Sequence, residues 1–169
     1  LVVEGDTLKV INLTGHKLIS GYPEGRRMWL RVTWTDGGGN VVRTDGAYGP
    51  MTVLLDAEAV LVDSLLSPDD PHTHQYLVHQ GMSQEWAAGL VGLGWDPGLD
   101  LAFDRMTGEV TLTLGDVASG APGTAQETFH FVLNDSVLSD RRIPPYGMRY
   151  DAARERNILP VPETLYGDP

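Results

Sequence analysis

The chain has 169 residues, which is enough for one domain that buries a core without disulfides. Its 23 acidic and 12 basic residues give a formal net charge of −11, which excludes nucleic acid as an expected partner because phosphate binding requires a positive surface. There is no cysteine, so disulfides, thiolate metal sites, cysteine nucleophiles and C-x-x-C-H haem attachment are excluded within these residues.

The apolar runs are short. The longest, Val53–Leu55 and Ala59–Val62, fall far below the roughly 20 residues that a membrane helix needs, so we expect a soluble segment with no membrane insertion. The first residue is Leu1 rather than an initiator methionine, which suggests a processed product or a piece of a longer protein. Twenty glycines and eleven prolines favour many short strands joined by turns.

The N-terminal third predicts three strands. Leu8–Ile11 alternates and leads into a glycine-rich loop. In Met28–Thr35 one face has Met28, Leu30, Val32 and Trp34 and the other has Trp29, Arg31, Thr33 and Thr35, which is the two-residue period of a half-buried strand. The turn Asp36–Asn40 then connects to Val41–Arg43, which is a strong hairpin signal because glycine and asparagine tolerate positive φ.

The middle of the chain is less regular. After Gly46–Pro50 the alternation is unclear, but Thr73–His79 again predicts a strand. Ser83 is placed to cap a short helix over Gln84–Leu90.

The last third predicts two further strands, at Val110–Leu114 and Thr128–Leu133, with a loop over Gly115–Ala125 between them. One helical turn is expected at Asp151–Arg156, and Leu159–Pro162 is typical of an extended tail.

Six to eight alternating strands bury their apolar faces most economically in two packed antiparallel sheets. We therefore predict an all-β fold, an antiparallel β-sandwich with one or two short helices and an extended proline-rich C-terminal tail. The expected organisation is a β-sandwich domain over residues 1–135 and an extended segment over residues 136–169, packed on the same domain or on a neighbour.

Two blocks of sequence carry a family resemblance: Asn12–Gly21, which contains Asn-Leu-Thr-Gly-His-Lys-Leu, and Phe129–Met148, which contains Arg-Ile-Pro-Pro-Tyr-Gly. They resemble the haem-free β-domain of bacterial multihaem c-type cytochromes, which has similar N-x-T-G-H-K-L-P-[TS]-G and R-I-P-P-x-G motifs. The resemblance extends from about Leu8 to Tyr166, and residues 50–125 do not contribute to it. Ile19 stands where the family has proline.

The resemblance implies a non-catalytic module in extracytoplasmic electron transfer, in the periplasm or at the cell surface. Such a module would shield or position haem c groups carried by another segment or chain. Its expected partners are the haem-bearing cytochrome domain or subunit and, through self-association, a homo-oligomer or polymer.

His16 is the sharpest candidate for contact with a cofactor. An imidazole on a glycine-flanked loop can approach a partner closely, and imidazole is a common axial ligand of haem iron. Lys17 beside it would favour the uncharged, metal-ready imidazole. The alternative is that His16 only holds the turn. Arg26 and Arg27 are candidates for pairing with haem propionates, or else bridge to acidic neighbours at the start of a strand.

Other groups are weaker candidates. His72, His74 and His79 follow Asp69 and Asp70 and superficially resemble a metal site, although a solvated loop entering a strand explains them better. The acidic loops make calcium a possible structural ion, but the sequence identifies no set of ligands for it. His130 is expected to be structural. Arg141–Met148 is either a docking strip or a crossover that covers a sheet edge.

Hydrolase and phosphate-binding motifs are absent, so no enzyme activity is predicted. The alternative function is a carbohydrate- or surface-binding β-sandwich, for which calcium is a possible stabilising ion. In that function Trp29, Trp86 or Trp95 would stack on sugars. A third reading is a hydrolase that uses an unrecognised carboxylate pair such as Asp100 and Asp104.

Overall fold

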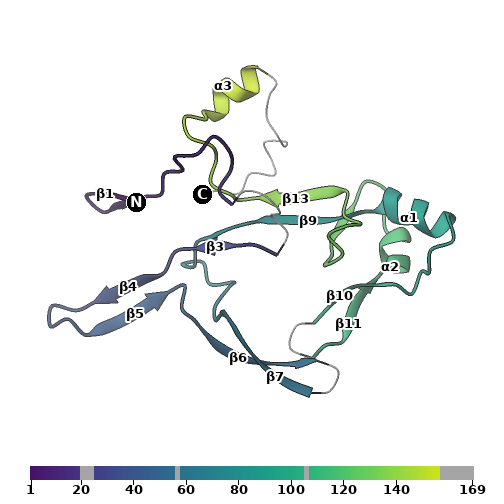
Figure 1. Ribbon diagram of the computed structural model, residues 1–169, viewed down its shortest axis with the longest axis horizontal. Helices are drawn as coiled ribbons and strands as arrows, with labels where there is room; N and C mark the ends of the chain where they lie inside the picture. The colour runs from purple at the N-terminus through teal and green to yellow at the C-terminus, as the bar shows by residue number, and fades with distance from the viewer. Residues whose placement is uncertain (20–24, 56–57, 105–106, 157–169) are drawn as a thin grey trace. The chain divides into compact units, whose positions relative to one another are not determined.

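The computed structural model describes residues 1–19, 25–55, 58–104 and 107–156 (Figure 1). Strands dominate, the sheets are antiparallel and the helices are few and short. The predicted all-β, sandwich-like class is therefore confirmed. Short apolar alternations separated by glycine and proline explain why the strands are brief.

The strands are joined into small sheets. One three-stranded sheet has the order β12-β9-β13, and the two-stranded pairs are β1-β2, β3-β8, β4-β5, β6-β7 and β10-β11. The strands are β1 Val2–Glu4, β2 Thr7–Lys9, β3 Met28–Trp29, β4 Val32–Thr35, β5 Val41–Asp45, β6 Tyr48–Leu55, β7 Glu58–Leu65, β8 Gln75–Tyr76, β9 Val78–Ser83, β10 Asp100–Phe103, β11 Val110–Thr113, β12 Ala125–Glu127 and β13 Ser136–Asp140. The helices are α1 Gln84–Gly92, α2 Leu114–Ala118 and α3 Tyr150–Glu155.

The chain divides into two compact units. The terminal unit comprises Leu1–Met28, Gln75–His79 and Ser139–Pro169, and the central unit comprises Trp29–His74 and Gln80–Leu138. The chain passes between them within β3, within β9 and within β13, as well as just before β8. The N-terminal segment and the C-terminal segment thus belong to one unit.

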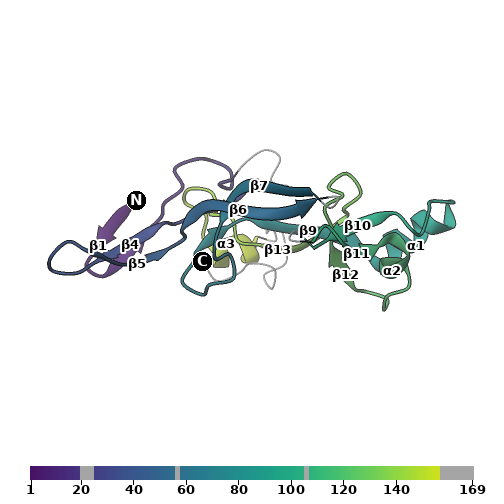
Figure 2. The ribbon, with the colours of Figure 1, turned by 90° about the horizontal axis from the view of Figure 1, so that it is seen from below.

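The central unit has a hydrophobic core around its two helices, which lie side by side next to β10 and β11 (Figures 1 and 2). Its buried members come from β9, α1, β10 and α2, namely Met82, Ala87, Leu90, Leu101, Leu114 and Val117. Helix α1 begins where predicted, because the Ser83 hydroxyl accepts a hydrogen bond from the Trp86 amide at 3.2 Å.

The predicted hairpin after Met28 is also confirmed. Strands β4 and β5 pair antiparallel from Val32↔Asp45 to Thr35↔Val41, and the Asp36 carboxylate accepts hydrogen bonds from the amides of Gly38 and Asn40 inside the turn. The strand predicted over residues 28–35 is interrupted, because the Leu30 amide bonds instead to the His74 carbonyl at 3.0 Å.

Two predictions for the last third are wrong. Residues 128–133 form a turn rather than a strand: the Thr128 hydroxyl donates to Asn134 Oδ1 at 2.6 Å, and the Leu133 amide bonds to the His130 carbonyl. Residues 114–118, expected as the end of a strand and the start of a loop, form helix α2, which has a capping box between Thr113 and Asp116.

Other boundaries shift by a few residues. The strand expected at 73–79 is divided into β8 and β9, with His72 and His74 in the preceding loop. The helical turn expected at 151–156 is α3, and the tail at 159–162 lies outside the described residues. Among the described residues, no helix has the length and apolar character needed to cross a bilayer.

Candidate functional site

The first block of sequence that carries the family resemblance and the end of the second block, from Ser139 to Met148, belong to the terminal unit. Leu18 and Ile143 exchange two backbone hydrogen bonds, each 2.9 Å long, in an isolated antiparallel bridge. The Tyr146 amide donates to the Thr14 carbonyl, also at 2.9 Å. The loop that carries His16 is therefore built from both ends of the chain.

Asn12 is the central polar group of this loop. Its side chain is buried, and its amide nitrogen donates to the carbonyl of His16 at 2.6 Å and to that of Pro144 at 3.0 Å. Its Oδ1 accepts from the backbone amide of Thr14 at 2.9 Å. A buried amide satisfied on both sides fixes the local backbone, because each lost bond would leave a buried polar atom unpaired.

His16 is exposed, and its ring is oriented by Thr14. The Thr14 hydroxyl lies 3.3 Å from Nδ1 and donates its single hydrogen to Asn12 Oδ1 at 2.7 Å or to the His16 carbonyl at 2.9 Å. In the tautomer that carries its proton on Nδ1, the imidazole donates to the hydroxyl, and the hydroxyl hydrogen goes to one of these two oxygens. The lone pair is then on Nε2, which has no hydrogen-bond partner among the described residues.

Beneath the loop lies a buried carboxylate with two cations. Asp140 is 1% exposed, and its Oδ2 lies 2.6 Å from Lys17 Nζ and 2.7 Å from Arg142 Nη2. Its Oδ1 accepts from Arg142 Nε at 2.9 Å. Arg142 also donates to the Ile19 carbonyl at 3.4 Å. Asp140 therefore ties the two blocks of sequence together electrostatically, through Lys17 of the first block and Arg142 of the second.

The charge on Asp140 is stable in this setting. Burial favours the neutral acid, but the hydrogen bonds from Arg142 and Lys17 outweigh it and hold the pKa of Asp140 below its ordinary value. The ammonium group of Lys17, next to His16 in sequence, is paired with this carboxylate.

The predicted arginines are not brought to His16 by any described contact. Arg26 is exposed and Arg27 is half-buried, and residues 20–24, which connect them to the loop, lie outside the described residues. The hydrogen bonds of His16 in the described part of the chain go to Asn12 and Thr14.

The other histidines are dispersed. His72 and His74 are exposed in a loop where Asp70 Oδ1 accepts from the His72 amide at 2.7 Å, and His79 is half-buried in β9. Over the described ranges, no group of three or more histidines and carboxylates is arranged to hold a metal ion. Asp70 and Asp104 each accept hydrogen bonds from amides in their own turns.

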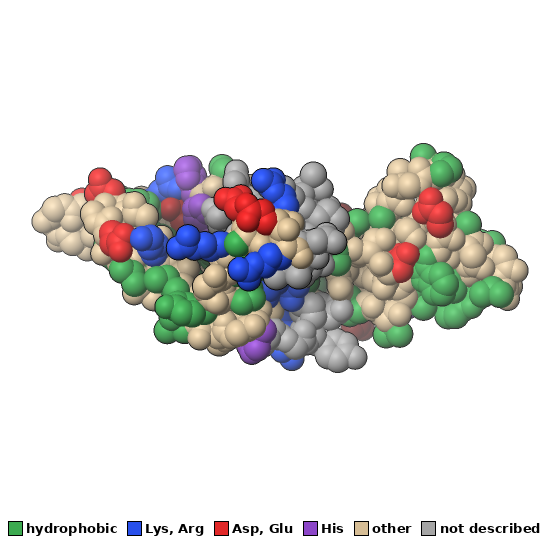
Figure 3. Space-filling view, turned by 90° about the horizontal axis from the view of Figure 1, so that it is seen from above, with side chains coloured by type: hydrophobic (Ala, Val, Ile, Leu, Met, Phe, Trp, Pro, Cys, Tyr) green, Lys and Arg blue, Asp and Glu red, His purple; other side chains and the backbone are tan. Residues whose placement is uncertain are grey.

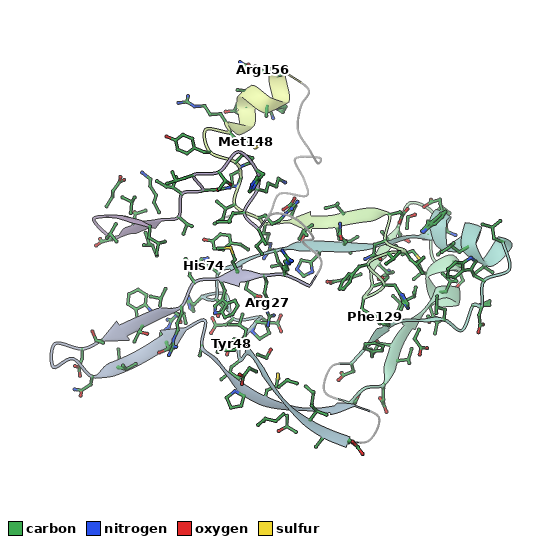
Figure 4. The ribbon with its side chains drawn as sticks, viewed as in Figure 1. Arg27, Tyr48, His74, Phe129, Met148 and Arg156 are labelled. Carbon is green, nitrogen blue, oxygen red and sulfur yellow. The ribbon has the colours of Figure 1, made fainter. Side chains whose placement is uncertain are left out.

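His130 and its neighbours form an aromatic stack in the central unit. Phe129, labelled in Figure 4, lies with its centroid 4.0 Å from that of Phe103 and 4.7 Å from that of His130. Among the tryptophans, Trp29 is half-buried and stacks on Tyr48, whereas Trp86 and Trp95 are 41% and 43% exposed.

The two units differ strongly in charge. By sequence, the terminal unit holds nine basic and eight acidic residues, whereas the central unit holds three basic and fifteen acidic residues. Basic side chains gather near one another on the face shown in Figure 3. The central unit therefore has a formal net charge of 3 − 15 = −12, and the terminal unit has one of 9 − 8 = +1.

Sequence reasoning singled out His16 but not the residues that position it. Asn12 and Thr14 stand within the quoted motif, and their spacing matches an Asx turn, which was the available signal. Asp140 carries no such signal, since one more carboxylate in an acidic chain is not distinctive and its burial depends on tertiary packing.

No protein-family model, curated protein or solved structure matches this chain.

Proposed function

We propose that this protein is a non-catalytic module of an extracytoplasmic multihaem c-type cytochrome assembly, and that it presents His16 as an axial ligand to a haem carried by another segment or chain. The observation that carries the proposal is the setting of His16: an exposed imidazole whose Nδ1 lies 3.3 Å from the Thr14 hydroxyl and whose Nε2 has no hydrogen-bond partner among the described residues.

The surrounding contacts suit this role. Metal-binding histidines commonly donate their second ring N–H to a nearby oxygen, which sets the tautomer and the ring orientation. Thr14 supplies such an oxygen, and Asn12 holds the backbone carbonyl of His16. A haem bound here would supply one-electron transfer, and the contribution of this chain would be to orient the ligand and exclude water.

Titration with a haem c peptide that has one open axial position tests the proposal. We expect the wild-type chain to convert the haem to a low-spin form, seen as a saturable shift of the Soret band. The variant His16→Ala should abolish the shift, and Thr14→Val should weaken it because the tautomer is no longer held. His74→Ala, which removes another exposed histidine, is the matched control.

The outcomes separate a built ligand from an ordinary surface imidazole. If His16→Ala binds the haem peptide as the wild type does, the ligand role is wrong. If His74→Ala reduces the shift as much as His16→Ala, any exposed histidine suffices and the proposal fails as well.

The alternative of carbohydrate binding has one specific support. The Trp86 indole N–H donates to the Leu133 carbonyl at 2.9 Å, which holds an exposed ring in a fixed position. Sugars stack on such rings. If tryptophan fluorescence responds saturably to soluble oligosaccharides and Trp86→Ala removes the response, this function is favoured over haem contact.

A further inference from the structure

The outer edge of β7 is an unpaired strand edge in the central unit. Strands β6 and β7 pair antiparallel without a break from Tyr48↔Leu65 to Leu55↔Glu58 (Figure 1). Within the described ranges no third strand joins this sheet. The stretch Ala59–Val62 has no proline, glycine or charge, which are the usual devices that protect an edge from pairing.

The same stretch is apolar on both faces. Ala59 and Leu61 project to one face of the sheet and Val60 and Val62 to the other, because side chains alternate along a strand. Leu61 is 71% exposed and Val60 is 38% exposed. Strands with apolar residues on both faces are typical of the interior of a sheet. The stretch Ala59–Val62 therefore has the composition of an interior strand, although it lies at the edge of its sheet.

Pro50 shows which backbone groups point outward. It lies opposite Asp63 and has no N–H, so this pair fits the class in which partners do not exchange hydrogen bonds. The classes alternate, which places Leu61, opposite Thr52, in the same class. The N–H and C=O groups of Leu61 and Ala59 then point away from β6, and no described residue bonds to them.

Charge indicates the kind of strand that fits. Glu58 and Asp63 bracket the apolar stretch and both are exposed, within a unit that has fifteen acidic and three basic residues. A second copy pairing antiparallel through this edge would bring only uncharged and acidic residues of β7 to face Glu58 and Asp63, since β7 has no basic residue. Lys or Arg on an incoming strand would instead give these carboxylates partners of opposite charge and stabilise the pairing.

We propose that the outer edge of β7 binds an extended segment of another protein by strand addition, and that this segment has apolar residues flanked by Lys or Arg. Main-chain hydrogen bonds to Ala59 and Leu61 would supply the pairing, and the flanking charges would set its direction and selectivity. The proposal is independent of haem binding at His16.

A fluorescently labelled peptide of sequence Lys-Lys-Val-Thr-Val-Thr-Val-Lys-Lys is the probe. We expect saturable binding by fluorescence anisotropy, weakened by salt because the flanking charges are exposed. Leu61→Pro removes one outward N–H but no bond to β6, so it should weaken binding by roughly tenfold or more. Leu61→Thr keeps the N–H and should retain most of the affinity, and Val41→Lys, on the exposed β4-β5 hairpin, is the matched control.

A charge swap gives a second readout that does not depend on the proline. The double variant Glu58→Lys with Asp63→Lys should lose affinity for the basic peptide and gain it for the same peptide with glutamate flanks. Circular dichroism of each variant checks that the fold is retained.

Three results would overturn the proposal. They are failure of the basic peptide to bind the wild type, equal binding by the Leu61→Pro and Leu61→Thr variants, and concentration-dependent self-association in sedimentation experiments that Leu61→Pro abolishes. The last result would make a second copy of this chain the occupant of the edge.

Discussion

Asp140 is a buried carboxylate that connects distant segments of the terminal unit. It is buried, and it is bonded to cations from both sequence blocks, Lys17 and Arg142. Removing one member of a buried ion pair costs more than the pair contributes, because the remaining charges stay desolvated.

The variant Asp140→Asn tests this dependence. It keeps the size of the side chain but leaves the charges of Lys17 and Arg142 without a counterion, so we expect the free energy of unfolding at pH 7 to fall by about 3 kcal/mol. Urea titration monitored by circular dichroism measures it. Asp6→Asn, an exposed carboxylate in the same unit, is the control and should change stability by less than about 0.5 kcal/mol.

The free energies of unfolding of the wild type and of Asp140→Asn should approach one another in acid. Since the pKa of Asp140 is depressed in the folded protein, its stabilising effect is present above the ordinary carboxyl pKa and is lost as the pH falls through the folded pKa, below about 3.9. A difference between wild type and Asp140→Asn that stays constant from pH 7 to pH 3 would contradict the assigned charge.

Elements differ in how much of them could be predicted. The β4-β5 hairpin and α1 were predictable because their signals are local: a glycine-rich turn after an alternating strand, and a serine cap before the helix. Thr128–Leu133 misled the prediction because Phe129 and Phe131 alternate like a strand, whereas Phe129 is held by stacking on Phe103, far away in sequence.

Helix α2 and the β6-β7 hairpin were missed for different reasons. The glycine, serine and proline after α2 masked a capping box that Thr113 and Asp116 do encode. In β6, Gly49 and Pro50 weaken the strand pattern, although the non-hydrogen-bonded position accommodates proline. The site was predictable only as far as His16, since the contacts of Asn12 and Asp140 connect residues more than a hundred positions apart.

Gly81 in β9 gives a prediction at the scale of the element. A Cβ at this position would meet the Gln126 carbonyl in β12, which belongs to the backbone and cannot move aside. Gly81→Ala should therefore destabilise the protein by about 2 kcal/mol, within the range for overpacking. Gly89→Ala in α1 is the control, because nothing lies within 4 Å of its added methyl group, and it should stabilise the helix by up to about 1 kcal/mol. Thermal unfolding of both variants measures the contrast, and a neutral Gly81→Ala would contradict the β9-β12 packing.

At the scale of the molecule, the two units differ in what stabilises them. The central unit has a cluster of buried apolar side chains around Leu101 and Leu114. In the described part of the terminal unit, Ile143 and Ala153 are buried together with the polar side chains of Asn12 and Asp140. Apolar burial is insensitive to salt and pH, whereas the stabilisation from the buried ion pairs of Asp140 is not.

Hydrogen exchange of Leu101→Ala tests whether the units open separately. The substitution removes a fully buried side chain and should cost about 3 kcal/mol. We expect faster exchange of amides in α1, α2 and β10, with smaller changes at Leu18 and Ile143. A uniform increase across both units would show instead that they unfold as one.

The interleaving of the two units has a consequence for biosynthesis. The side-chain amide of Asn12 donates to the carbonyl of Pro144, which is synthesised 132 residues later. The ammonium group of Lys17 likewise pairs with Asp140, which is also synthesised late. During synthesis from the N-terminus, the central unit can condense while the segment that bears His16 still lacks half of its support. The loop that carries His16 would thus be completed late, once residues 140–146 have left the ribosome.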